Sequence, residues 1–303
     1  MVAAMSTGAT PPAVGTPAAG RLRRAATAAA AAGCAVALVT GCVQHGAAAG
    51  GEPAAAEARP GGAKDAGGDA SAAVWDAADA LVRAGSSLVE TSMRMASGGT
   101  WVTVTGTGRF DYARRQGELI LVLPRDAAGA EEHRPVTEVM TPGALYMKDR
   151  GAGVPAGKWV RVDTTALPDG NLVTGGATEP LAAAELLRGA QQVVLVGEEA
   201  LGGTPVRHYR GVADIARAAR AAAPGTSGAL TAAAGGFAVT RVPFDAWLDA
   251  EGRLRRLTEH FTFGAKGSGV GVVSTTVFDG FGALVAFATP RGDDIWAGKI
   301  VSS

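Results

Sequence analysis

The chain has 303 residues, and 28 basic side chains balance 28 acidic ones, so no net field draws it to nucleic acid or to an anionic lipid surface. Hydrophobic residues make up 47% of it, but much of that is alanine and aromatic residues are only 5%, so the total overstates the material for a core. The two cysteines, Cys34 and Cys42, lie in the opening stretch, which excludes a disulfide framework, a cysteine-ligated zinc site and a cysteine nucleophile for the rest of the chain.

Residues 1–41 have the order of a secretory signal peptide. Three arginines lie within residues 21–24, and an uncharged run follows over residues 25–40. A run of about 16 small residues is short for a membrane-spanning helix, which needs ~20. The run ends in Val-Thr-Gly-Cys, which resembles the bacterial lipobox. That resemblance implies cleavage after Gly41 and attachment of a diacylglyceryl group to Cys42, the new N-terminus.

The alternative is an uncleaved anchor that ends in an ordinary cysteine. The lipobox interpretation is favoured because basic residues, an apolar run, small residues and a cysteine come in that order. Two or three acyl chains on Cys42 would hold the protein firmly, at ~0.8 kcal/mol per buried methylene. We therefore expect a protein attached by lipid to the cell membrane, on its extracytoplasmic face.

Residues 42–72 comprise this cysteine and a segment of Ala, Gly, Pro and scattered charges with almost nothing to bury. The composition predicts a flexible tether, which as a coil would reach roughly 30 Å on average.

Residues 73–298 are predicted to form one domain, followed by a short tail at 299–303. Apolar residues at steps of three and four predict an amphipathic helix over residues 74–90. The period then becomes two, which predicts a pair of strands joined across Gly98 and Gly99. Further strands are expected at ELILVLP, VTEVM, ALYMK, KWVRVD, QQVVLVG, PVRHYRG, RVPFDAWLD, RLRRLTEHFTF, GVGVVSTTVF and ALVAFATP.

Helices are expected at PLAAAELLRG and over residues 213–222, whereas PGTSGALTAAAGG at 224–236 is expected to be a mobile loop. About eleven strands and two or three helices, connected mainly by short turns, exclude a doubly wound parallel sheet. The predicted fold class is α+β, with one large curved antiparallel sheet whose concave face is covered by helices.

Several segments in order resemble a known family. They are GALYMKD, KWVRVD, GAQQVVLVGEEALGGTPVRHYRG, FDAWLDAEGRLRRL and FDGFGALVAFATP. Over residues 74–295 the chain is similar to the actinobacterial LppX/LprAFG lipoproteins, which have the LolA-like fold. The resemblance implies a half-barrel with helices packed into its mouth, enclosing an apolar cavity that holds acyl chains.

No catalytic or metal-binding constellation is predicted, and no cofactor is expected. The histidines, His45, His133, His208 and His260, do not lie at metal-ligand spacing. GAGVPA at 151–156 precedes a strand and not a helix, so it reads as a hairpin loop and not as a phosphate-binding turn. Ser227 lacks the Gly-x-Ser-x-Gly context of a hydrolase nucleophile.

An acidic pair and a basic cluster near residue 250 are two further candidates for a functional role. Asp245 and Asp249 could serve as an acid and a base, but the pattern around them favours a turn shaped by Asp249. Arg253, Arg255 and Arg256 form a small basic cluster, which is read as a solvated sheet edge or as a contact to lipid headgroups.

Alternation points ten apolar side chains toward the covered side of the sheet. They are the candidate lining of a ligand cavity: Val102, Val104, Leu121, Leu145, Met147, Val194, Val196, Leu257, Phe261 and Phe263. From the residues alone, a dry core and a cavity are equally compatible with this pattern, and the family resemblance favours the cavity. The expected function is binding or carriage of a lipid, glycolipid or other apolar ligand without chemical conversion. The alternatives are a sensor or partner-binding lipoprotein with a filled core, and a surface hydrolase, which the motifs disfavour.

Replacing the lipobox cysteine tests the predicted anchor. The Cys42→Ser variant lacks the thiol that would accept the diacylglyceryl group, so it is expected to leave the membrane fraction for the soluble one. Fractionation of producing cells followed by immunoblotting measures this, and a variant that persists in the membrane fraction would reject the anchor.

Overall fold

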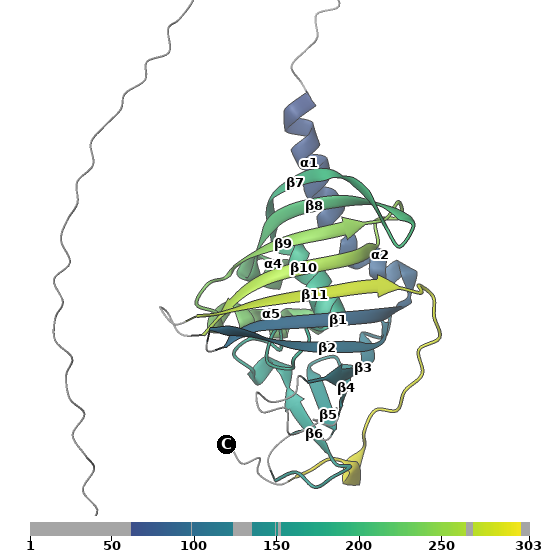
Figure 1. Ribbon diagram of the computed structural model, residues 1–303, viewed down its shortest axis with the longest axis vertical. Coiled ribbons are helices and arrows are strands. Elements are labelled where there is room, and N and C mark those ends of the chain that lie inside the picture. Colours follow the sequence, from purple (N-terminus) through teal and green to yellow (C-terminus); the bar gives the residue numbers. More distant parts are fainter. Residues whose placement is uncertain are drawn as a thin grey trace, which may run out of the picture. The chain divides into compact units, whose positions relative to one another are not determined.

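The computed structural model describes residues 62–97, 99–123, 135–148, 150, 153–264 and 269–297 (Figure 1). The predicted signal peptide, Cys42, the first part of the predicted tether and the tail at 299–303 lie outside these residues. Within them, no helix has both the length and the hydropathy that crossing a membrane requires.

Eleven strands make up a single sheet in the described part of the chain, and all neighbouring strands are antiparallel. They are β1 Ser86–Ser97, β2 Thr100–Asp111, β3 Gln116–Val122, β4 Val136–Thr141, β5 Ala144–Lys148, β6 Trp159–Asp163, β7 Ala190–Leu201, β8 Thr204–Asp214, β9 Arg241–Leu248, β10 Leu254–Phe263 and β11 Val270–Asp279. The sheet is open, and helices accompany it, which confirms the predicted fold class.

The order of the strands is β6-β5-β4-β3-β2-β1-β11-β10-β9-β8-β7. The first and last strands of the sheet in chain order therefore pair in its middle, and β6 and β7 lie at its two edges. Because β7 follows β6 in sequence, the link between them, residues 164–189, connects opposite edges. This link carries η1 Thr164–Ala166, α3 Pro180–Leu186 and η2 Leu187–Gly189, and it supplies much of the cover of the concave face.

The remaining helices are α1 Gly62–Trp75, α2 Ala77–Ala84, α4 Ile215–Ala221 and α5 Pro224–Gly236. In Figure 1 the sheet lies in front, with α4 and α5 behind it. Leu181 of α3, Ile215 of α4 and Leu230 of α5 are fully buried and belong to one hydrophobic cluster with sheet residues such as Phe244 and Leu257. The core of the protein is thus the space between the concave face and these helices.

The predicted helix over residues 74–90 was wrong in its extent. The helical segment begins earlier, with α1 starting at Gly62 inside the predicted tether, and α2 ends at Ala84. Gly85 ends it with a φ of 82°, a conformation that favours glycine. Beyond that residue the chain is already in β1, which contains Leu88 and Val89.

Two other segments also differ from the sequence expectation. Residues 224–236, the expected loop, form α5, which begins with Pro224 at its first position and buries Leu230 and Ala233. ALVAFATP was predicted to be a strand, but residues 283–290 have no regular secondary structure, and Leu284 is exposed. Both neighbours of β11 in the sheet are already β1 and β10, so no free edge remains beside it for a further strand.

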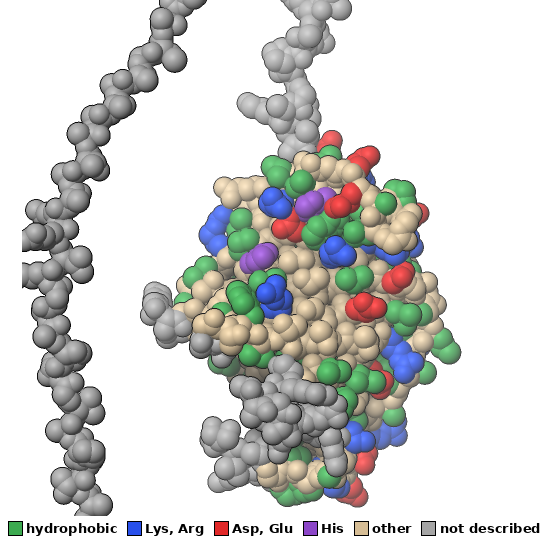
Figure 2. All heavy atoms as spheres, viewed as in Figure 1, with side chains coloured by type: hydrophobic (Ala, Val, Ile, Leu, Met, Phe, Trp, Pro, Cys, Tyr) green, Lys and Arg blue, Asp and Glu red, His purple; other side chains and the backbone are tan. Residues whose placement is uncertain are grey.

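The face of the sheet opposite the helices is chemically mixed. Figure 2 shows basic and acidic side chains interspersed with hydrophobic ones over this face. The distribution agrees with the balanced net charge, since neither sign forms a broad field in this view.

Replacing a glycine in β2 tests how closely β2 and β3 pack. A Cβ atom built on Gly108 would lie 1.9 Å from the carbonyl oxygen of Glu118 and 2.7 Å from Cδ2 of Leu119, so Gly108→Ala must displace backbone as well as side chain. We expect the free energy of unfolding to fall by about 2 kcal/mol, measured by urea denaturation. Gly197→Ala in β7 is the matched control, because its Cβ would meet no atom within 4 Å. Equal stabilities for the two variants would contradict the expectation.

Candidate functional site

The predicted lining residues are mostly on the concave face. Five of them are buried in the core, namely Val104, Leu121, Leu145, Leu257 and Phe261. Met147 and Phe263 are partly buried and pack against this core. Val102 is half-buried and shares the face of Val104 through the regular pairing of β2 with β1. Their role in binding a ligand stays a prediction.

Val194 and Val196 were wrongly assigned to the covered side. They are 55% and 50% exposed, respectively. β7 is an edge strand, and its pairing with β8 shifts register between Gln191 and Val194 and again between Leu195 and Gly197. Each shift breaks the two-residue alternation on which the prediction depended, so alternation in this strand does not identify the residues on the core face.

The chain's own side chains fill much of the space behind the sheet. The ring of Phe237, which follows α5, lies 5.8 Å from that of Phe261 and 5.3 Å from that of Phe263, measured between centroids. The leucines Leu181 and Leu187 of the link are fully buried. Around these residues the interior is an ordinary packed core.

A cavity of about 130 Å³ remains toward the β6 end of the sheet. It lies between β5 and β6 on one side and residues 164–178, which we call the cover segment, on the other. We call it the β5–β6 cavity. Its lining residues are Leu145, Met147, Arg150, Val162, Leu167, Asn171, Thr174 and Gly175. Two of the ten predicted residues, Leu145 and Met147, thus line a cavity.

An arginine connects this cavity with a buried carboxyl group. Nη1 of Arg150 donates a hydrogen bond of 2.7 Å to the carbonyl oxygen of Gly175 and lies 3.9 Å from Oε1 of Glu138. The Arg150 side chain is 35% exposed, whereas that of Glu138 is completely buried. Glu138 is the register partner of Met147, so the carboxyl group lies beside the cavity wall.

Burial raises the pKa of Glu138 to about 8, and the positive charge of Arg150 only partly opposes this. At neutral pH the group therefore keeps its proton. Neither of its oxygens has a hydrogen-bond partner within the described residues. Burial also raises the pKa of Glu259 in β10, and Oε1 of that residue is likewise unpartnered there.

The cover segment is held in place by a buried aspartate. The Asp169 carboxylate accepts hydrogen bonds from the backbone N–H groups of Asn171, Val173 and Thr174. Gly170 packs so closely on α5 that a Cβ atom would lie 2.0 Å from the carbonyl oxygen of Ala229. These contacts fix Asn171 at a φ of 65°, with its side chain 4% exposed in the cavity wall.

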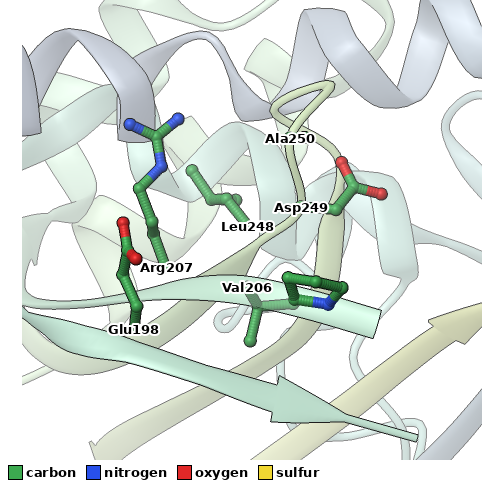
Figure 3. Close-up of a pocket in the computed structure, with 7 residues that line it drawn as sticks. Glu198, Val206, Arg207, Leu248, Asp249 and Ala250 are labelled. Carbon is green, nitrogen blue, oxygen red and sulfur yellow. The ribbon is translucent and has the colours of Figure 1, made fainter. Parts of the chain in front are cut away.

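A second pocket, of about 160 Å³, lies toward the other edge of the sheet. Pro205, Val206 and Leu248 provide its apolar wall. Glu198 and Arg207, which face each other across β7 and β8, extend to the same side in Figure 3. No ion pair joins them, and the pocket's remaining lining is the Asp249–Ala250 turn.

The two aspartates weighed from the sequence do not act on a common group. Oδ1 of Asp249 accepts from the backbone N–H of Glu251 and of Arg253, which confirms that Asp249 shapes the turn. Asp245 instead accepts hydrogen bonds from Arg210 and pairs with His208.

The contacts of His208 are those of a surface network. Nε2 lies 2.6 Å from Oδ1 of Asp245, Nδ1 lies 3.9 Å from Oε1 of Glu199, and the ring stacks on Trp247 at 4.3 Å. Both ring nitrogens therefore face carboxylates and not a hydroxyl group. Among the described residues, no three His, Cys, Asp or Glu side chains gather closely enough to hold a metal ion.

Other motifs singled out from the sequence have local roles. Ser227 lies in α5, and its hydroxyl donates to the carbonyl oxygen of Pro224. Residues 153–156 of GAGVPA lie between β5 and β6, as expected for a connecting loop, while His45 and His133 lie outside the described residues. His260 is exposed on β10.

The basic cluster does not lie on a sheet edge, because β10 has β9 and β11 as neighbours. Arg253 forms ion pairs with Asp249 and Glu251, and Arg255 with Asp279. The guanidinium of Arg256 lies over the ring of Trp247. Each arginine thus has a partner within the chain.

Comparison with known proteins gives structural matches only. No family model matches the chain, and no curated protein matches it. Among solved structures, lipoprotein LppX of Mycobacterium tuberculosis matches with a TM-score of 0.42 and 11% identity, covering 72% of this chain and 98% of that one. LprF from Mycobacterium bovis matches with a TM-score of 0.39 and 15% identity, covering 74% and 98%.

The MucA/MucB complex of Pseudomonas aeruginosa gives a TM-score of 0.31 and 17% identity, covering 78% of this chain and 64% of that one. LppX and LprF carry the names of the family that the sequence resembles. At these identities and scores, the function of the chain has to be argued from its own geometry.

Six of the eight residues that line the β5–β6 cavity, and Glu138 beside it, were not among the ten predicted residues. Glu138 could have been found, because in VTEVM it alternates with Val136 and Met140 and so falls on the buried face. Arg150 and Asn171 lie outside regular strands, where no periodicity reports the direction of a side chain.

Protonation of Glu138 predicts a specific pH dependence. The folded state keeps the proton up to about pH 8, whereas the unfolded chain releases it above about pH 4.5, so the free energy of unfolding falls as pH rises between these values. This fall amounts to about 1.4 kcal/mol per pH unit. Glu138→Gln has no proton to release, so its free energy of unfolding should not fall in this way, and near neutral pH the variant is expected to be more stable than the native chain.

Urea denaturation at several pH values in that window measures the effect. Glu198→Gln, at an exposed position of β7, is the control and should follow the native chain. If the Glu138→Gln curve runs parallel to that of the native chain, the carboxyl group is not held protonated by burial.

Proposed function

We propose that this protein binds an apolar ligand, of the lipid class, between the sheet and its cover, without converting it chemically. The observation that carries the proposal is the β5–β6 cavity, whose aliphatic wall comes from Leu145, Met147 and Val162 on the sheet and Leu167 on the cover segment. Apolar walls with a few polar groups at defined places are the usual composition of a small-molecule site. Transfer of apolar ligand surface from water into such a wall contributes about 25 cal/mol per Å².

The size of the cavity fixes how a ligand enters it. At about 130 Å³ it is smaller than the ~300 Å³ of ordinary ligand pockets, so it receives one end of a long ligand. The rest of the chain of such a ligand lies along the apolar sheet face once the cover segment moves aside. Residues 167–178 carry no helix or strand, and a displacement there breaks no regular secondary structure.

The proposed location is the outer face of the cell membrane, with attachment through lipid at Cys42. The lipobox pattern supports this, and it lies outside the described residues. An anchored protein of this kind would collect its ligand from the membrane that holds it.

Absence of chemical conversion is part of the proposal. Arg150 and Asn171 bind and orient, and neither is a nucleophile; the hydroxyl group of Thr174 has no histidine among the lining residues to activate it. The remaining candidate, His208, is held by Asp245 and Glu199 in the outer surface network, among side chains that do not line the β5–β6 cavity.

A second candidate function is a partner-binding or sensing lipoprotein whose interior is filled. The packing of Phe237 on Phe261 and Phe263 favours it, because this part of the concave face has no room for a ligand. In that case the β5–β6 cavity would be a packing defect that holds solvent.

Native mass spectrometry of the protein purified from its own membranes tests the proposal, with solvent extraction to identify what is bound. We expect co-purified lipid in the native chain and a severalfold lower occupancy in Met147→Trp, because the larger ring fills the cavity. Val194→Trp, on the exposed edge, is the matched control and should retain the ligand. Bare native protein would support the filled-core alternative, and equal occupancy in both variants would place the ligand elsewhere.

A further inference from the structure

The β5–β6 cavity contains buried oxygen atoms without a hydrogen-bond partner. Oδ1 of Asn171 has none within the described residues, although the side chain is 4% exposed and lines the cavity. Both oxygens of Glu138, beside the cavity wall, are also without one. Buried polar groups are nearly always paired in folded proteins, so such atoms indicate a partner that is not part of the chain.

Gly175 and Arg150 connect the amide of Asn171 with the carboxyl group of Glu138. A Cβ atom on Gly175 would be 2.8 Å from Oδ1 of Asn171, and the carbonyl oxygen of the same glycine accepts from Nη1 of Arg150. Arg150 in turn lies 3.9 Å from Oε1 of Glu138. One side of the cavity is therefore polar and is formed by Asn171, Gly175 and Arg150. It lies opposite the aliphatic wall of β5 and β6.

We propose that the β5–β6 cavity selects an apolar ligand that ends in a hydroxyl group. This inference rests on the proposed function and names the class of ligand. An amide oxygen can only accept, so the missing partner of Asn171 is a donor. A hydroxyl group donates one hydrogen bond and can accept another, here from the guanidinium of Arg150. A carboxylate cannot donate, and a hydrocarbon end leaves the acceptor unpaired.

The size and opening of the cavity suit a group of this kind. A volume of about 130 Å³ corresponds to roughly four water-sized groups at ~30 Å³ each, enough for a hydroxyl group and the first few carbons of a chain. The partial exposure of Arg150 shows that the polar side communicates with solvent, which gives the hydroxyl end a path inward.

Chain-matched probes test the proposal on the full chain carrying Cys42→Ser. The probes are 1-octanol, octyl methyl ether and octanoate, titrated by calorimetry. We expect octanol to bind about tenfold more tightly than the ether, because only the alcohol donates a hydrogen bond to the buried acceptor. In Asn171→Gly, which keeps the left-handed backbone and removes the acceptor, the ratio of alcohol to ether affinity should fall to about one.

Asn171→Asp is the matched control, since it retains an acceptor oxygen and tolerates the same backbone conformation, and it should keep the preference. Equal binding of alcohol and ether by the native chain overturns the hydroxyl inference and leaves the proposed function standing. Tightest binding of octanoate overturns it in favour of an anion site on Arg150. If no probe binds, the cavity holds only solvent and the inference fails, while co-purified lipid decides the proposed function separately.

Discussion

The fold depends on a connection that must cross the sheet. Strands β6 and β7 are consecutive in sequence but lie at opposite edges, so residues 164–189 have to pass over one face. This passage brings α3 and the cover segment against the concave side, where a hydrophobic cluster forms around them. The cover is therefore a consequence of strand order. How closely it packs against the sheet determines which parts of the interior are filled by side chains and which contain a cavity.

The cover packs unevenly along its path. Near α3 it is helical, and leucines and alanines fill the space against β10. In the cover segment the backbone N–H groups are held by hydrogen bonds to Asp169, and Leu172 and Val173 are its buried large apolar side chains. The β5–β6 cavity lies where this thin part of the cover meets two short strands. The proposed binding thus depends on the space that the cover segment leaves against these strands.

Most of the sheet could be predicted because period-two alternation is a local signal. Ten of the segments expected as strands or strand pairs lie in strands, and PLAAAELLRG is helical. The misplaced ALVAFATP segment is apolar enough for a strand, but strand pairing is decided by neighbours that the local sequence does not contain. Val194 and Val196 show the same limit, since two register shifts in β7 break the alternation on which the assignment to a face depends. The polar side of the cavity could not be predicted from the sequence, because it depends on Asn171 in a left-handed conformation within a link that has no periodic pattern.

The central pairing of β1 with β11 affects how the sheet folds during synthesis of the chain. Register partners such as Val89 and Phe278 are separated by 278 − 89 = 189 residues, so the two halves of the sheet are joined only when all eleven strands of the sheet have been synthesised. Contacts of such sequence separation close slowly. Until β11 arrives, β1 and β10 each present an unpaired strand edge, which is a template for aggregation. The last strand to be synthesised is therefore the one that protects the two halves from other chains.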